Sequence, residues 1–109
     1  MTRKAILLVH TNAAGPEHEA AFDTWYEQVH IPQLLERVPG IVRATRFTTS
    51  PAGPPTEYRH LALYEIEAED PGAVLGAIGE AAAAGKLDMS PAMDSRPPVM
   101  TLYESARSA

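Results

Sequence analysis

The residues best suited to chemistry lie in one short segment, Phe22–Pro32, with the sequence FDTWYEQVHIP. It contains the chain's single tryptophan and one of its four histidines. An imidazole titrates at about pH 6.5, which suits proton transfer at neutral pH, and Tyr26 lies about one helical turn before His30. We predict His30 and Tyr26 as catalytic residues. The alternative is that His30 caps a helix end or bonds to a backbone carbonyl.

Four other residues are candidates for contacts with a ligand. Trp25 offers an aromatic surface, although packing of a helix on a sheet would also explain it. His10 ends one expected strand and His60 lies within another, and for both the alternative is a structural histidine with satisfied nitrogens. Tyr64 shares a strand face with His60 and Tyr58, so it would line either a pocket or a dimer interface. We predict substrate-binding roles for Trp25, His10, His60 and Tyr64.

Other kinds of chemistry find little support. The chain has no cysteine, which excludes thiolate metal sites and cysteine nucleophiles, and no histidine spacing matches a metal motif. Phosphate-binding glycine loops and nucleophile elbows are also missing. Met89 and Met93 are four residues apart and could face a haem, but loop packing explains them as well. We expect no metal and no cofactor.

Composition limits the partners. A chain of 109 residues with 45% hydrophobic and 21% charged residues is typical of one soluble domain, here residues 1–109. A net charge of −5 argues against binding nucleic acid or a membrane surface. Only Ala5–Val9 follow the basic start as an apolar run, which is too short for a signal peptide. We expect a cytoplasmic protein.

The elements that would position these residues follow from hydrophobic patterning. Short apolar or alternating runs predict four strands, over Lys4–Thr11, Ile41–Thr48, Glu57–Glu67 and Val99–Glu104. One helix should begin at Pro16, and a second should run from Pro71 to Ala84, with Asp70 as its N-cap and Gly85 as its stop. Gly76 and Gly79 weaken that second helix, so we expect them to allow close approach of a neighbouring backbone.

The first helix has a conflict in its apolar pattern. Phe22, Trp25 and Tyr26 share one face, whereas Leu34 and Val38 project to nearly the opposite side of a straight helix. Proline inside a helix removes a hydrogen bond and disfavours helical angles at the residue before it. We therefore predict a kink or break near His30, with Pro32 starting a second segment and His30 at a helix end.

The order β-α-β-β-α-β predicts an α+β, ferredoxin-like fold with a four-stranded antiparallel sheet. In such a fold two helices cover one face of the sheet. A wet opposite face should show alternating polar residues, yet Ala5–Val9 and Leu61–Tyr64 are apolar throughout. We therefore expect a homodimer joined sheet to sheet.

The chain resembles the dimeric α/β barrel superfamily, and its EthD-like branch in particular. The resemblance is carried by Phe22–Pro32, the Val38-Pro39-Gly40-Ile41 turn, Arg46-Phe47 and Leu61–Glu65. It implies a pocket between sheet and helices for a small hydrophobic or aromatic ligand, and His30 matches the histidine of the EthD-like motif.

Two functions follow as expectations. The first is a cofactor-independent enzyme acting on a small apolar, aromatic or polyketide-like substrate by histidine-assisted proton transfer. Such a protein would be a cyclase, dehydratase, isomerase or cofactor-free monooxygenase. The second is a non-catalytic dimeric module that binds a small molecule or serves as an accessory subunit.

Overall fold

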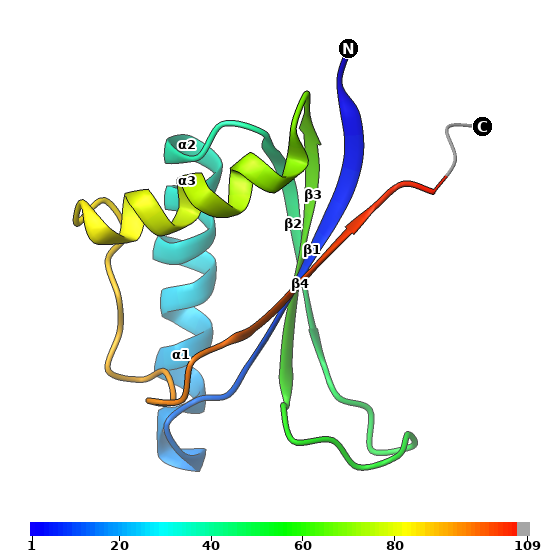
Figure 1. Cartoon of the computed structure of the whole chain (residues 1–109). Coiled ribbons are helices and arrows are strands. Elements are labelled where there is room, and N and C mark those ends of the chain that lie inside the picture. The colour runs from blue at the N-terminus through cyan, green and yellow to red at the C-terminus, as the bar shows by residue number, and fades with distance from the viewer. Residues whose placement is uncertain (107–109) are drawn as a thin grey trace.

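The computed structural model of the chain describes residues 1–106. Helices cover one face of a four-stranded antiparallel sheet, and the other face is bare (Figure 1). The strands lie in the order β2-β3-β1-β4. Their bounds are β1 Arg3–Thr11, β2 Ile41–Thr48, β3 His60–Ala68 and β4 Val99–Glu104. The element order confirms the α+β, ferredoxin-like prediction, and β3 begins three residues later than the sequence pattern indicated.

Side chains of β1 alternate strictly between the two faces of the sheet. Leu7, Val9 and Thr11 are buried beneath the helices, while Ile6 and Leu8 on the opposite face are only half-buried. The same alternation runs along β3, as the two-residue period of a strand requires. The apolar runs of the sequence therefore correspond to one face covered by helices and one apolar face without a cover in residues 1–106.

The first helical region is continuous, so the chain does not break near His30, but the predicted second segment is present as α2 (Ile31–Arg37), which begins at Ile31 with Pro32 in its first turn. It consists of a short 3₁₀ turn, an α-helix, one π-helical turn and a second α-helix: η1 Pro16–His18, α1 Glu19–Trp25, η2 Tyr26–His30 and α2 Ile31–Arg37. Ile31 keeps helical angles, φ −60° and ψ −48°, although a proline follows it. His30 thus lies within the helical region and not at its end.

The π-helical turn resolves the conflict between the two apolar faces. The backbone N–H of Ile31 donates to the carbonyl of Tyr26, five residues earlier, in place of the usual four. This wide turn accommodates one extra residue, which turns the following helix back by roughly 100°. As a result Phe22 and Trp25 before the turn and Leu34 and Val38 after it are all buried in one core.

The second helix, α3, runs over Pro71–Ala83. Gly85 ends it with a φ of +74°, as expected for a glycine after a helix. Asp70 occupies the N-cap position, but its side chain makes no capping hydrogen bond. No atom lies within 4 Å of a Cβ built on Gly76 or Gly79, so the expected close backbone approach is wrong.

After α3 the chain returns as a long irregular segment that runs beside α1 before it enters β4 (Figure 1). The return segment, residues 84–98, contributes Met89, Met93 and Pro98 to the lining of a cavity on the helix-covered side of the sheet. Within residues 1–106 no helix has the length and hydrophobicity needed to span a membrane.

Candidate functional site

An apolar cavity of about 110 Å³ lies between the sheet, the π-helical turn and the return segment. Leu7 and Val9 of β1 contribute to its wall from the sheet, and Leu34 and Ile78 do so from the helices. The return segment contributes Leu87, Met89, Met93 and Pro98. Polar side chains reach this lining only from Thr11, Tyr26, His30 and Tyr64.

Three hydroxyl groups line the cavity from two strands and the π-helical turn. Thr11, Tyr26 and Tyr64 are 4%, 2% and 1% exposed. Thr11 Oγ1 and Tyr64 Oη are buried without any partner at normal hydrogen-bond geometry. Both nevertheless lie near enough to the Tyr26 hydroxyl to favour its ionised form. Tyr26 is therefore the centre of the hydroxyl cluster.

Burial keeps both tyrosines protonated. It raises the pKa of Tyr26, and the neighbouring Tyr64 hydroxyl, the Arg46 charge and the Thr11 hydroxyl oppose that rise. Burial raises the pKa of Tyr64 as well, and the adjacent Tyr26 raises it further. At neutral pH the cavity therefore presents phenol O–H groups that can donate hydrogen bonds.

The imidazole of His30 is held between two aromatic rings at the end of the π-helical turn. It stacks on Trp25 with ring centroids 4.6 Å apart and planes inclined by 22°. It also meets the Tyr26 ring edge-on at 5.1 Å. Its Nδ1 is buried and has no hydrogen-bond partner. The ring is thus oriented by packing, with one nitrogen left unpaired.

Burial lowers the pKa of His30 from its ordinary value of 6.5 to about 4. No carboxylate compensates for the loss of water around the ring, because desolvation is the one cause of the shift. At neutral pH the imidazole is therefore uncharged. Such a ring can accept a proton or a hydrogen bond but holds a positive charge poorly.

Trp25 stacks on His30 and also holds the return segment in place. Its indole Nε1 donates to the backbone carbonyl of Asp88 at 2.7 Å. Gln33 makes two further bonds to Asp88, accepting from its backbone N–H at 2.7 Å and donating to its carboxylate at 2.8 Å. Arg37 donates to the carbonyl of Lys86. These bonds clamp the wall beside Leu87 and Met89 to the first helical region.

The structure brings together three of the six residues predicted from the sequence. His30, Tyr26 and Tyr64 line one cavity. Trp25 is 8% exposed and supports His30 from behind without lining the cavity. His10 lies on the bare face of the sheet, where its ring is 6.2 Å from that of Tyr58, because side chains of neighbouring strand residues point to opposite faces.

His60 belongs to a separate polar network. Arg46 Nη2 lies 3.2 Å from its Nδ1, and its Nε2 lies 2.9 Å from Glu19 Oε1. A guanidinium can only donate, so Nδ1 accepts and Nε2 carries the proton that bonds to Glu19. The ring is 2% exposed and both nitrogens have partners. This geometry corresponds to the structural alternative for His60.

Sequence reasoning missed Thr11 and Arg46. Thr11 is two and four residues beyond Val9 and Leu7, so strand alternation alone could have placed its hydroxyl on the buried face. Arg46 gave no such signal, because a charged residue on a weakly alternating strand is usually exposed. Its side chain is in fact 12% exposed.

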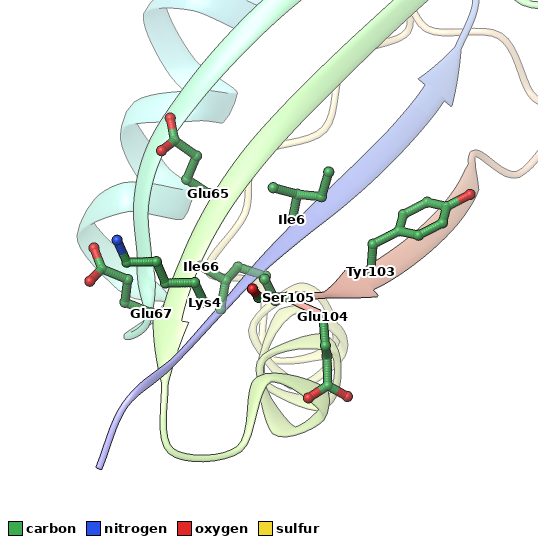
Figure 2. Close-up of a pocket in the computed structure, with 9 residues that line it drawn as sticks. Lys4, Ile6, Glu65, Ile66, Glu67, Tyr103, Glu104 and Ser105 are labelled. Carbon is green, nitrogen blue, oxygen red and sulfur yellow. The ribbon is translucent and has the colours of Figure 1, made fainter. Parts of the chain in front are cut away.

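A second depression, of about 320 Å³, opens at the far end of the sheet. Figure 2 shows Ile6 and Tyr103 side by side on neighbouring strands, with Glu104 directed away from them. Lys4, Glu65 and Glu67 complete a charged border. No unpartnered buried polar side chain from residues 1–106 lies there, so we place the candidate site at the smaller cavity. Among these described residues no group of three metal-ligating side chains is close enough to hold a metal ion.

The sequence matches no protein-family model and no curated protein. Solved structures, however, share its fold along almost the whole chain. A protein named "putative monooxygenase" from Shewanella loihica PV-4 matches with a TM-score of 0.62 at 15% identity, covering 99% of both chains. An EthD-like protein from Ralstonia eutropha JMP134 matches with a TM-score of 0.57 at 15% identity, covering 99% of this chain and 98% of the other.

An ethyl tert-butyl ether D (EthD) family protein from Bacillus halodurans C-125 matches with a TM-score of 0.52 at 21% identity. That match covers 94% of this chain and 98% of the other. This chain has the EthD-like fold. The resemblance seen in Phe22–Pro32 is thereby confirmed at the level of the fold. An EthD-like fold does not itself specify chemistry, so the function has to be argued from the cavity.

Proposed function

We propose that this protein is a cofactor-independent enzyme that transfers a proton on a small, apolar, aromatic or polyketide-like substrate, with His30 as the base. One observation carries the proposal. His30 Nδ1 is buried without a partner, and Thr11 Oγ1 and Tyr64 Oη have no neighbour for hydrogen bonding except the Tyr26 hydroxyl; all three residues line the same apolar cavity. A buried nitrogen left unsatisfied costs about 1–3 kcal/mol. A ligand with an apolar body and a polar end would satisfy them.

The protonation state of His30 suits a base that takes a proton from a neutral substrate and leaves the substrate as an anion. In the tautomer that carries its proton on Nε2, the neutral ring has its lone pair on Nδ1. Burial lowers the pKa of His30 to about 4. An imidazolium is disfavoured there because the cavity offers no counter-charge. A substrate that loses a proton to Nδ1 and keeps the electron pair as an enolate or phenolate supplies that charge. Tyr26 and Tyr64 would then donate hydrogen bonds to the new oxyanion.

This single step is shared by the reactions expected for the fold. Cyclisation, dehydration and isomerisation of a carbonyl compound all begin with loss of a proton beside the carbonyl group. Cofactor-free oxygenation begins with the same anion and consumes molecular oxygen as the oxidant. The name of the Shewanella loihica protein is compatible with the last of these.

The test is deuterium exchange into small enolisable ketones, followed by NMR. The native protein should accelerate exchange, and His30→Gln should slow it by about 100-fold or more, since general-base catalysis contributes roughly 10²–10⁴-fold. His18→Gln is the matched control, because that histidine is exposed in η1 and pairs only with the neighbouring Glu17. Equal exchange rates for the native protein and His30→Gln would remove His30 as the base.

A non-catalytic binding or accessory module is the second candidate, and the small size of the cavity favours its accessory form. About 110 Å³ is below the roughly 300–1,000 Å³ of typical ligand pockets. A larger substrate would need Met89 to move, and that flexible side chain is 58% exposed. Mass spectrometry of the purified protein distinguishes the two cases when combined with exchange: a retained ligand without exchange activity supports the binding module.

We also propose that the protein works as a homodimer joined through the bare face of the sheet. Phe47, Val99 and Tyr103 on that face are 48%, 44% and 54% exposed. Half-buried Ile6, Leu8, Leu61 and Leu63 lie between them on β1 and β3. A contiguous apolar surface of this kind is typical of a protein interface.

A further inference from the structure

Arg46 is a partly buried cation, 12% exposed, that lies against the ring of Tyr26 in the hydroxyl cluster. It projects from β2 towards the helices, and its guanidinium carbon lies 4.8 Å from the centre of the Tyr26 ring and 5.6 Å from that of Phe22. Tyr26 lines the cavity, whereas Arg46 does not. Arg46 therefore does not touch a ligand in the cavity, and its charge acts on the two tyrosines that line the cavity, Tyr26 and Tyr64.

The acidic partners of Arg46 lie on its solvent side. Asp23 Oδ1 is 2.9 Å from Nη2 and Glu27 Oε1 is 3.4 Å from Nη1, and these carboxylate side chains are 50% and 66% exposed. Water screens exposed charges far more than buried ones. Although two carboxylates face one cation, the guanidinium is the least exposed of the three charges and therefore the least screened.

A cation over a phenol ring stabilises the phenolate more than the phenol, because the ionised ring is richer in electrons. The charge of Arg46 accordingly lowers the pKa of Tyr26 and of Tyr64, against the larger effect of burial. A phenol O–H polarised in this way donates a stronger hydrogen bond to a negative oxygen than to a neutral one. His60 holds the guanidinium from a third side at 3.2 Å.

We propose that Arg46 is a positioning residue that makes the cavity selective for ligands whose oxygen carries negative charge, namely phenols and enols acidic enough to bind as phenolates or enolates. Its charge acts through the Tyr26 hydroxyl, next to Tyr64 and Thr11. The inference rests on the proposed function, because it takes the cavity to be the place where the reacting oxygen binds. The alternative is a purely structural ion pair between β2 and the first helical region.

The test measures binding of fluorinated phenols by fluorine NMR titration. Fluorine is small, and each added fluorine makes the phenol more acidic with little change in shape. The native protein should bind a trifluorophenol about tenfold more tightly than a monofluorophenol, a ratio within the range of one cation–π interaction. The corresponding fluorobenzenes, which lack the oxygen, control for shape and should bind alike.

The Arg46→Met variant should lose the dependence on phenol acidity while its affinity for the fluorobenzenes stays unchanged. Methionine keeps an unbranched apolar stem and removes the charge, and Arg46→Lys should restore part of the dependence. Arg43→Met is the matched control on the same strand, because Arg43 is 73% exposed and pairs with Glu65. Equal affinities across the phenol series in the native protein, or the same dependence in Arg46→Met, would overturn the inference, as would failure of every phenol to bind.

A variant with a surface change keeps the test decisive if Arg46→Met does not fold. Asp23→Asn removes a half-exposed carboxylate that partly offsets the charge of Arg46. The effect of that charge on Tyr26 should therefore increase, and the dependence on phenol acidity should become steeper. An unchanged or shallower dependence counts against the inference. These equilibrium affinities are measured independently of proton exchange. If His30→Gln abolishes exchange while phenol selectivity persists, the two proposals are separated. They are separated equally well if exchange depends on His30 but the native protein shows no phenol selectivity.

Discussion

At the scale of single residues, surroundings distinguish His30 from the other histidines of the chain. His60 is more deeply buried, at 2% exposed, but Arg46 and Glu19 satisfy both of its nitrogens. His10 lies on the bare face of the sheet. Only His30 combines a buried, unpartnered nitrogen with a position on the cavity wall. The chemical assignment therefore depends on a missing hydrogen bond more than on residue type.

The lowered pKa of His30 predicts a pH dependence of stability. The unfolded chain binds a proton at His30 near pH 6.5, and the folded chain does so only near pH 4. Between these values the unfolded state holds more protons, so the free energy of unfolding falls as the pH falls. The loss should be on the order of 3 kcal/mol over that range.

Urea denaturation of the native protein and of His30→Gln, followed at intervals from pH 7 to pH 4, isolates this contribution. Both proteins share the carboxylates that also titrate in acid. The native protein should lose more stability than the variant below about pH 6.5, and the two should run parallel above it. Parallel curves over the whole range would mean that His30 titrates normally in the folded chain.

At the scale of elements, the π-helical turn decides where His30 points. An α-helix through Tyr26–His30 would leave Leu34 and Val38 on a different side from Phe22 and Trp25. The extra residue of the turn brings both sets into the same core. Turns of this kind occur frequently at functional sites, and here the turn carries two of the four polar residues of the cavity.

Helix α3 should become more stable when its glycines are replaced by alanine. Gly76 and Gly79 are exposed, lie inside the helix and have open space around the position of a Cβ. Alanine is favoured over glycine in helix interiors by about 1 kcal/mol. Thermal denaturation of Gly76→Ala and Gly79→Ala should show a gain of about this size for each.

Gly40→Ala is the opposite control for these two substitutions. Its φ is +101°, and an added Cβ would lie 3.0 Å from a methyl group of Val74. It should destabilise the protein because alanine rarely adopts that backbone conformation. Loss of stability in Gly76→Ala or Gly79→Ala would instead point to a close neighbour at α3 that residues 1–106 of one chain do not supply.

At the scale of the whole molecule, the helices and the cavity lie on one side of the sheet and an apolar surface lies on the other (Figure 1). The second depression, at Ile6 and Tyr103, belongs to this surface (Figure 2). Pairing of two sheets would bury it without altering the cavity. Assembly and chemistry are therefore separable by mutation.

Lysine substitutions on the bare face should break the proposed homodimer. Phe47→Lys and Tyr103→Lys place a charge among apolar side chains, and each should weaken dimerisation by tenfold or more, since buried aromatic residues often contribute about 2 kcal/mol to an interface. Sedimentation velocity or light scattering measures the change. Leu35→Lys is the control, because Leu35 is 40% exposed on α2, away from the sheet. A native protein that is monomeric at micromolar concentration would contradict the proposal.

Local pattern was enough to predict the architecture. The strands over Ile41–Thr48 and Val99–Glu104 have the predicted bounds, and the helix from Pro71 begins where predicted. These features depend on alternation, proline and glycine, whose effects extend over a few neighbouring residues. The same reasoning proposed His30, Tyr26 and Tyr64 as candidates, because an imidazole and phenols among apolar residues are unusual wherever they lie, and their functional roles stay predictions.

Only the tertiary structure decided how these residues combine. The change of apolar phase across Pro32 is visible in the sequence, but that pattern did not distinguish a break from a π-helical turn, since either one reorients the segment that follows. Thr11, His30 and Tyr64 are remote in the chain and meet only when β1 and β3 pair beneath the helix. Whether a buried polar atom finds a partner depends on that packing in three dimensions. For that reason the placement of Thr11, His30 and Tyr64 around one cavity became visible only in the folded chain.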